Sequence, residues 1–258
     1  MRGAIFNNID VAQVVLYMFF IFFAGLVMYL RREDKREGYP LESERSGQVI
    51  VQGFPELPAP KTYKLAGGGT QVSPRREIDT REIKAVPSEP WPGAPVQPTG
   101  DPMIDGVGPA AYAMRSNSPD MTFDGHTRIV PLRVATTHHL ESRDPDPRGM
   151  KVIGADGRVG GTVTDAWVDR SECLIRYLEV EVADSGASAR RVLLPINFTR
   201  IDGRKRQVNV RSILAKHFAN VPTLANNDQV TRREEDRICA YYGGGQLYAL
   251  PGRSEAIL

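Results

Sequence analysis

Two short segments of the chain carry side chains that could pass protons. Glu172 follows Asp169 by three residues in the turn between two predicted strands, and Asp124-Gly-His126 lies earlier in the chain. Carboxylates and imidazoles relay protons when they lie within hydrogen-bond or one-water distance, above all where burial raises a carboxylate pKa. On the residues alone, Asp169 and Glu172 are explained more simply as solvated turn residues, and His126 fits an ordinary exposed histidine equally well. The rest of the sequence must therefore decide whether these four residues act in proton transfer.

Other kinds of chemistry find no support in the sequence. Cys173 and Cys239 have no metal-binding spacing, and the four histidines form no H-E-x-x-H pattern. Cys173 stands next to Glu172 without an identifiable base, and no phosphate-binding loop accompanies them. The formal net charge of +2, from 33 basic and 31 acidic side chains, gives no broad electrostatic argument for nucleic-acid binding. We expect a protein that is not an enzyme, has no metal site of its own and binds no nucleic acid.

One segment near the N-terminus is built to cross a membrane. Val11 to Leu30 contains no charged residue, and its 20 positions would span about 30 Å as a helix. A charged run from Arg31 to Glu37 follows it, with four basic residues, whereas only Arg2 precedes it. The positive-inside rule then puts the short N-terminus outside and the rest of the chain in the cytoplasm. A cleaved signal peptide is the alternative, but it would have a shorter apolar region and a small-residue cleavage site.

The next part of the chain, residues 31–129, is rich in proline. Because proline fixes φ and removes a backbone donor, long helices and central strands are disfavoured there. A solvated linker would carry fewer large apolar residues than this segment does, among them Phe54, Tyr63, Trp91 and Tyr112. We therefore predict an extended segment that packs on another surface, such as that of a partner subunit.

Residues 130–258 have the pattern of a β domain. Four strands are predicted, at 161–168, 174–182, 191–194 and 207–210, with turn residues between them at Ala155-Asp-Gly157, Asp184-Ser-Gly186 and Asp202-Gly-Arg204. Within the second strand Leu178, Val180 and Val182 alternate with Glu179 and Glu181, which predicts one buried and one solvent-facing side. Short strands at this spacing predict a small antiparallel sheet or barrel.

Two helical pieces are expected near the end of the chain. Ser212 to Ala219 is short, enough for one or two turns. Thr231-Arg-Arg-Glu234 is a capping-box pattern that opens a helix toward Tyr241. We predict that Gly243-Gly-Gly245 ends this helix, because glycine readily adopts the left-handed conformation at a helix C-terminus.

Several segments, in order along the whole chain, resemble one family. They are Arg36-Glu-Gly-Tyr-Pro-Leu41, Pro60-Lys-Thr62, Pro98-Thr-Gly-Asp-Pro-Met103, Asp105-Gly-Val-Gly-Pro-Ala110, Trp167-Val-Asp169, Tyr177-Leu-Glu179, Glu234-Glu-Asp236 and Gly244-Gly-Gln-Leu-Tyr248. Together with a single N-terminal helix, this order is similar to that of the H subunit of the photosynthetic reaction centre of purple bacteria.

The resemblance implies a fold, partners and a location. The fold would be a single N-terminal transmembrane helix followed by a mainly β cytoplasmic domain, a PRC-barrel-like antiparallel barrel with a short C-terminal helix. The chain would cap the cytoplasmic face of the L and M subunits in the bacterial inner membrane, with residues 1–10 in the periplasm and light-harvesting complex 1 and lipids around it. The pigments and cofactors (bacteriochlorophyll, bacteriopheophytin, quinones, carotenoid and non-haem iron) would belong to L and M, with none bound by this chain alone.

The resemblance also assigns roles to residues. Glu172 matches the family's proton-transfer glutamate near the secondary quinone, and Asp169 could share its network. Asp124 and His126 resemble the surface cluster where protons enter, although Arg128 stands where some relatives carry a second histidine, and arginine does not relay protons. Arg176 and Glu179 are expected to pair with charges of L or M.

Two other classes of protein remain open at this point. A membrane-tethered PRC-barrel adaptor with a different partner explains the helix and the barrel, but it does not predict the segments at 36–41 and 98–110. A membrane-bound enzyme lacks any of the catalytic constellations considered above.

Overall fold

The computed structural model describes residues 10–39, 41–42, 49–51, 53–65, 68–74, 79–91, 93–183 and 189–253. The chain divides into two compact units. The first comprises Met1–Asp79 with Trp91–Gly93, and the second comprises Thr80–Pro90 with Ala94–Leu258. Residues 1–9 of the predicted periplasmic segment 1–10 and the predicted turn at 184–186 lie outside the described residues.

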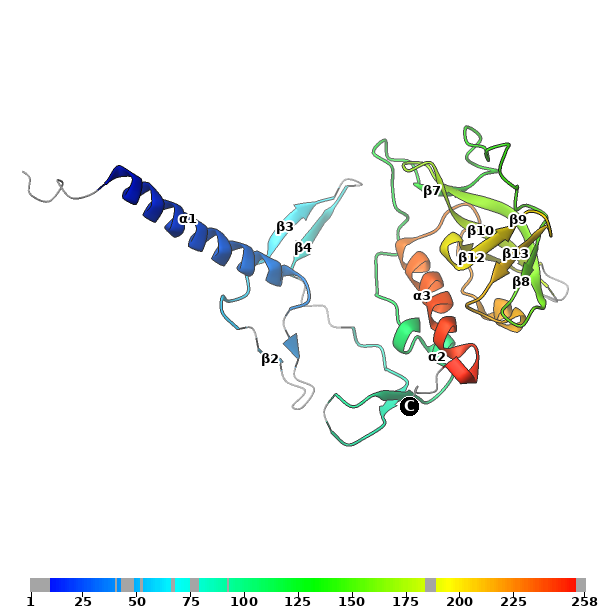
Figure 1. The fold of residues 1–258 in the computed structure, drawn as a ribbon, viewed down its shortest axis with the longest axis horizontal. Helices are drawn as coiled ribbons and strands as arrows, with labels where there is room; N and C mark the ends of the chain where they lie inside the picture. The colour runs from blue at the N-terminus through cyan, green and yellow to red at the C-terminus, as the bar shows by residue number, and fades with distance from the viewer. Residues whose placement is uncertain are drawn as a thin grey trace, which may run out of the picture. The chain divides into compact units, whose positions relative to one another are not determined.

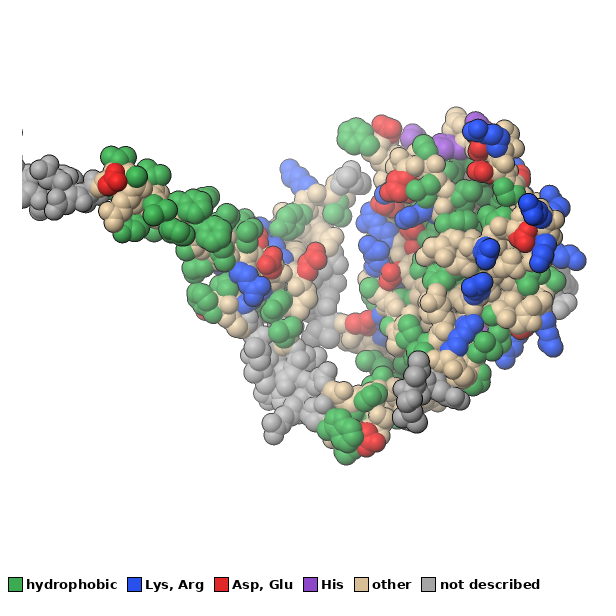
Figure 2. Space-filling view, in the orientation of Figure 1, with side chains coloured by type: hydrophobic (Ala, Val, Ile, Leu, Met, Phe, Trp, Pro, Cys, Tyr) green, Lys and Arg blue, Asp and Glu red, His purple; other side chains and the backbone are tan. Residues whose placement is uncertain are grey.

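Helix α1, Val11–Glu33, contains the predicted apolar segment and continues past it (Figure 1). Asp10 caps its N-terminus, where the carboxylate accepts the Ala12 N–H at 3.1 Å. None of its side chains is buried, and hydrophobic side chains cover its surface in Figure 2. By length and apolar composition the stretch Val11–Arg36 can cross a membrane, since it contains an 18-residue window with a mean hydropathy of 2.3. This agrees with the predicted spanning helix.

The cations that follow α1 also hold the adjoining backbone together. Lys35, in the 3₁₀ turn Asp34–Arg36, donates to the carbonyls of Gly53 and Pro55 and is itself buried. Arg36 pairs with Glu33 at 2.8 Å and donates to the carbonyl of Ser73 at 2.9 Å. A run of charges that the sequence explains by membrane topology therefore has a second, structural role.

The proline-rich segment forms short two-stranded sheets that the sequence analysis did not predict. In the first unit β1 (Leu41–Glu42) pairs with β2 (Val49–Val51), and β3 (Lys61–Lys64) pairs with β4 (Thr70–Ser73). In the second unit β5 (Ala85–Pro87) pairs with β6 (Val96–Pro98). All are antiparallel and two to four residues long, which fits the limit that proline sets on strand pairing.

The main sheet of the second unit has the order β11-β10-β9-β8-β13-β12, with β7 also paired to β9 (Figure 1). Its strands are β7 (Ile129–Pro131), β8 (Lys151–Ile153), β9 (Val159–Asp169), β10 (Leu174–Val182), β11 (Arg191–Pro195), β12 (Thr199–Asp202) and β13 (Gln207–Val210). All neighbours are antiparallel except β8 and β13, which are parallel. The four predicted strands are β9, β10, β11 and β13. The other three, β7, β8 and β12, have three or four residues and lack the alternation that is visible in Gln207-Val-Asn-Val210.

The core lies between this sheet and helix α3, Arg232–Tyr248. The short helix α2 (Pro102–Asp105) and the 3₁₀ turn Gly108–Ala110 pack against α3, and further 3₁₀ turns lie at Ile196–Phe198, Ala215–Asn220 and Pro251–Arg253. The largest fully buried side chains are Trp167, Tyr242, Phe218, Met150, Leu178, Leu193, Leu194, Ile213 and Ile238. Leu178, Val180 and Val182 are buried as predicted, whereas Glu179, predicted to face solvent, is only 4% exposed.

Helix α3 begins as predicted and ends later than predicted. Thr231 and Glu234 form the capping box, with the Thr231 Oγ1 accepting the Glu234 N–H at 3.2 Å. The predicted stop at Gly243–Gly245 is wrong, because the helix runs on to Tyr248. These glycines serve close packing instead: a Cβ on Gly244 would lie 2.5 Å from the Ala110 Cβ.

A substitution in this glycine run tests that explanation. In Gly245→Ala the new Cβ would lie 2.3 Å from the Ile213 Cγ2 and 2.8 Å from the Ser212 carbonyl oxygen. We expect a loss of about 1–3 kcal/mol in the free energy of unfolding, measured by chemical denaturation of the full chain. The matched change Gly243→Ala meets only the Pro109 carbonyl at 3.3 Å and should cost less. A more stable Gly245→Ala protein would show that helix propensity, not close packing, decides this site.

Candidate functional site

The guanidinium of Arg128 is the centre of a charged cluster in the second unit. Its Nε lies 3.0 and 2.9 Å from the two carboxylate oxygens of Asp169. Its Nη2 donates to Glu172, and its Nη1 lies 3.4 Å from an Asp120 oxygen. The pairing of Ile129 with Asp169, between β7 and β9, brings Arg128 beside the end of β9. Two of the predicted residues, Asp169 and Glu172, are therefore brought together by a third that the sequence analysis treated only as a departure.

Asp169 is fully buried and fixes the turn between β9 and β10. Its carboxylate accepts the backbone N–H groups of Ser171 at 2.9 Å and Glu172 at 3.1 Å as well as the Arg128 bonds. Burial by itself raises the pKa of Asp169, but the hydrogen bonds from Arg128 and from the two backbone amides outweigh it, and the net pKa lies below the ordinary value. Asp169 therefore stays ionised at neutral pH.

Glu172 differs from Asp169 in its access to solvent. Its side chain is 50% exposed, against 0% for Asp169, although both bind the same guanidinium. The turn is held by the Cys173 N–H, which donates to the Asp169 carbonyl at 2.8 Å, and Cys173 itself has a left-handed backbone with φ of 53°. Glu172 is the carboxylate of this pair that water can reach.

Asp124 and His126 lie at the exposed tip of a small hairpin. Met121 bridges to Thr127, and the Thr122 N–H donates to the His126 carbonyl at 2.8 Å. At the base of the hairpin Arg128 donates its backbone N–H to the Asp120 carbonyl at 2.8 Å. Among the described residues no hydrogen bond joins the side chains of Asp124 or His126 to the Arg128 cluster. The tip and the cluster are thus neighbours along the chain with separate hydrogen-bond networks.

The two predicted interface residues have different surroundings. The Arg176 side chain is 43% exposed, and its Nε lies 4.0 Å from an Asp169 oxygen. Glu179 is buried in an internal network: it accepts from Arg133 at 2.8 Å and from the Trp167 Nε1–H at 3.1 Å, and it pairs with Arg191 at 3.4 Å. This network explains why an acidic residue occupies a side of β10 that is not open to water. The pairing of Arg176 and Glu179 with a partner stays a prediction.

A second group of polar residues, absent from the sequence analysis, adjoins the cluster. Asp120 links Arg128 to Arg232, whose Nη2 lies 2.8 Å from the other Asp120 oxygen. Beside them is a pocket of about 530 Å³ lined by Arg115, Asp120, Leu174, Arg176, Tyr177, Pro195, Ile196, Asn197, Arg232, Glu235, Asp236 and Cys239. Burial raises the pKa of Glu235, and its hydrogen bond with the Tyr177 hydroxyl at 2.8 Å only partly opposes this. The predicted capping box at Thr231 already defined the first turn of α3. The sequence could therefore have identified Glu235 as a residue of that turn.

Replacement of Arg128 tests its place at the centre of the cluster. Arg128→Gln leaves Asp169 buried without its main cation, so the free energy of unfolding at pH 7 should fall by about 3 kcal/mol in chemical denaturation. The exposed Arg143, 3.2 Å from Glu141, offers a matched control, and Arg143→Gln should cost less than about 1 kcal/mol.

The pH dependence of the free energy of unfolding gives a second test of the pair between Arg128 and Asp169. Because the folded pKa of Asp169 is lowered, its contribution to stability is present at neutral pH and is lost as the pH falls through the folded pKa. The deficit of Arg128→Gln against wild type should therefore be largest near neutral pH and shrink on acidification. A deficit that does not change with pH would contradict this electrostatic account.

Comparison with known families accounts for both parts of the chain. Residues 3–134 match the family described as photosynthetic reaction centre, H-chain N-terminal region. Residues 140–215 match the PRC-barrel domain, which covers β8 to β13. The first match spans more than half of the chain and takes in α1, the short hairpins, the Asp124–His126 tip and Arg128. The second unit, which contains this PRC-barrel domain, is called the β unit below. The chain belongs to the photosynthetic reaction centre H-chain family.

Proposed function

We propose that this chain caps the cytoplasmic face of the reaction centre's L and M subunits and helps to deliver protons to the secondary quinone. The observation that carries the proton role is the half-exposed Glu172 held on Arg128 beside the buried Asp169. A membrane-tethered PRC-barrel adaptor would share the barrel, but it would not call for the H-chain match over residues 3–134. The family is one of structural subunits, which fits a supporting role without catalysis by this chain.

The capping role is supported by apolar surface that the chain leaves open. In the described part of the proline-rich segment, several large apolar side chains are exposed to solvent. The exposed fraction is 81% for Phe54, 44% for Tyr63, 51% for Val86 and 54% for Val96. Residues of this kind are enriched at protein interfaces, where a partner covers them. We assign this surface to packing on the L and M subunits, which the family implies as partners. The pigments, quinones and non-haem iron are assigned to those subunits as well.

Within the cluster we assign different tasks to the two carboxylates. Asp169 stays ionised and positions Arg128 and the turn, so it is a positioning residue rather than a carrier. Glu172 can exchange protons with water and with a neighbouring group. Arg128 fixes the direction of Glu172 without itself losing a proton. Asp124 and His126, at the exposed tip, are the groups from which protons would be collected.

We include a further carboxyl, that of Glu235, which lines the pocket next to the Arg128 cluster. Burial raises the pKa of Glu235, whereas hydrogen bonds from arginines and backbone amides lower the pKa values of Asp120 and Asp169, so of these three carboxyls Glu235 keeps its proton to the highest pH. The pocket that it lines also contains Arg176, the predicted interface residue. Arg176 would then face a partner from the same pocket that Glu235 lines.

The substitution Glu172→Gln tests the proton role, because it keeps the shape and removes the titratable group. Transfer of the second electron to the secondary quinone, followed after flashes between pH 6 and 9, should slow by at least about tenfold, while primary charge separation stays unchanged. Glu141→Gln is the matched control: Glu141 is 53% exposed and also pairs with an arginine. Second-electron kinetics in Glu172→Gln that equal those of the control would exclude the role.

The capping role has its own test. Purification of the full chain from its native membrane should bring with it a preparation whose near-infrared spectrum contains bacteriochlorophyll bands. A colourless preparation would favour a PRC-barrel protein with another partner. Orientation follows from protease access, since the β unit should be cleaved only from the cytoplasmic side.

A further inference from the structure

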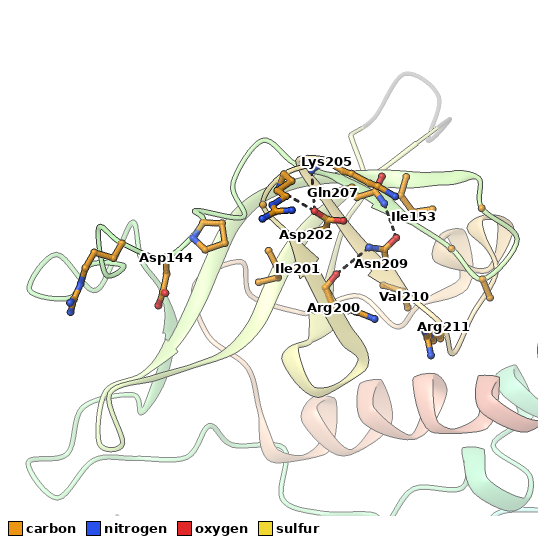
Figure 3. Close-up of a pocket in the computed structure, with 17 residues that line it drawn as sticks. Asp144, Ile153, Arg200, Ile201, Asp202, Lys205, Gln207, Asn209, Val210 and Arg211 are labelled. Carbon is orange, nitrogen blue, oxygen red and sulfur yellow. Dashed lines mark hydrogen bonds between the residues drawn. The ribbon is translucent and has the colours of Figure 1, made fainter.

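A groove of about 970 Å³ lies on the β unit, away from the residues discussed above. Figure 3 shows its lining side chains, which come from β8, β12 and β13 and from the loops around them. Five of these residues are cationic: Arg143, Arg200, Arg204, Lys205 and Arg211. Only two, Asp144 and Asp202, are acidic. Lysine and arginine side chains gather over the same strands in Figure 2. The groove therefore offers excess positive charge.

The positive charge of the groove is only partly neutralised by the described residues, since Arg143 alone of its five cations pairs with a carboxylate, that of Glu141 at 3.2 Å. The Asp202 carboxylate is engaged by the backbone, since it accepts the N–H groups of Arg204 at 3.1 Å and Lys205 at 3.0 Å. In the described parts of the chain no carboxylate lies within ion-pair distance of Arg200, Arg204, Lys205 or Arg211. The turn between β12 and β13 is thus held by Asp202 while its two cationic side chains stay available to a ligand.

The groove and the proton cluster lie at opposite ends of strand β9. Val159, at the start of β9, pairs with Ile153 in the groove, and Asp169 ends β9 in the Arg128 cluster. A strand rises about 3.3 Å per residue, so these ends are separated by at most about 33 Å along β9. A partner bound at the cluster end therefore leaves the groove free for a different ligand.

We propose that this groove binds an extended, acidic polypeptide segment of another protein. The cations come from three separate segments, around Arg143, along β12 and its turn, and at Arg211, which suits a ligand that carries several charges along its length. The side chains of Gln207 and Asn209 lie between them, where Figure 3 shows the amide of Gln207 bonded to Asn209 at 3.1 Å. The Asn209 amide nitrogen also donates to the Arg200 carbonyl at 3.4 Å, so the Gln207 carbonyl oxygen is the amide group best able to accept from a peptide backbone.

The position of β12 supports an extended ligand. This strand ends the main sheet and pairs only with β13 among the described strands, so its other edge has open main-chain groups. Extended segments commonly add to such an edge.

The groove lining contains no aromatic side chain, so bases of a nucleic acid would find no stacking platform. Its hollowed form also differs from the flat basic face that a lipid surface requires.

The test measures binding of a defined acidic peptide to the detergent-solubilised complex. The probe is a fluorescein-labelled peptide of alternating glutamate and alanine, followed by fluorescence anisotropy at about 0.1 M ionic strength, where charges act over about 10 Å. We expect saturable binding, weakened by salt. The variant Arg204→Gln/Lys205→Gln should weaken it by about tenfold, because it removes two of the five cations. Its turn should stay intact, since Asp202 binds the backbone of these residues.

The control removes one lysine and one arginine elsewhere. Lys64→Gln/Arg237→Gln changes two exposed cations and should alter the affinity by less than about twofold. The proposal is overturned if both variants weaken binding equally, if the glutamine version of the peptide binds as well, or if no binding is seen at about 1 mM peptide. An oligothymidylate of equal charge that displaces the peptide at lower concentration would overturn the choice of a polypeptide. Second-electron kinetics should be unchanged in the groove variant, which separates this proposal from the proton role.

Discussion

The ion pair between Arg128 and Asp169 is the interaction on which the proposed proton-transfer cluster depends. A carboxylate with no exposure to water needs a cation, and Arg128 supplies two hydrogen bonds at 3.0 and 2.9 Å. The same guanidinium binds Glu172 and approaches Asp120, so one side chain sets the positions of three carboxylates. Because Arg128 directly precedes β7 and Asp169 ends β9, strand pairing in the sheet fixes the geometry of the cluster.

Charged side chains at the end of α1 likewise take part in more than one interaction. Lys35 and Arg36 belong to the basic run from which the membrane orientation is predicted, yet they also donate to backbone carbonyls of the segment that follows. The chain thereby ties its membrane anchor to the short hairpins of the first unit. Charges to which we assign roles in topology, folding and proton transfer overlap in this protein, which makes single substitutions informative only beside matched controls.

The sequence was a good guide to regular elements and a poor one to tertiary contacts. The uncharged run from Val11 predicted α1, and β-branched residues predicted β9, β10, β11 and β13. Short strands such as β8 and β12 have no alternation to detect. They form because their backbones pair with neighbouring strands, β8 with β9 and β13, and β12 with β13. Gly243–Gly245 were misread because close packing and helix termination both favour glycine. At the site, Glu172 and Asp169 were found through family resemblance, whereas Arg128 and Glu235 depended on contacts between residues far apart in the chain.

The central claim is that Arg128 acts on quinone reduction through Glu172. A double-mutant cycle measures this directly, with Arg128→Gln, Glu172→Gln and the double variant compared by the rate of second-electron transfer in the native complex. The account predicts that Arg128→Gln slows transfer in the wild-type background and has little further effect once Glu172 is glutamine. Fully additive effects on the activation free energy would contradict it, because they would mean that the two residues act independently.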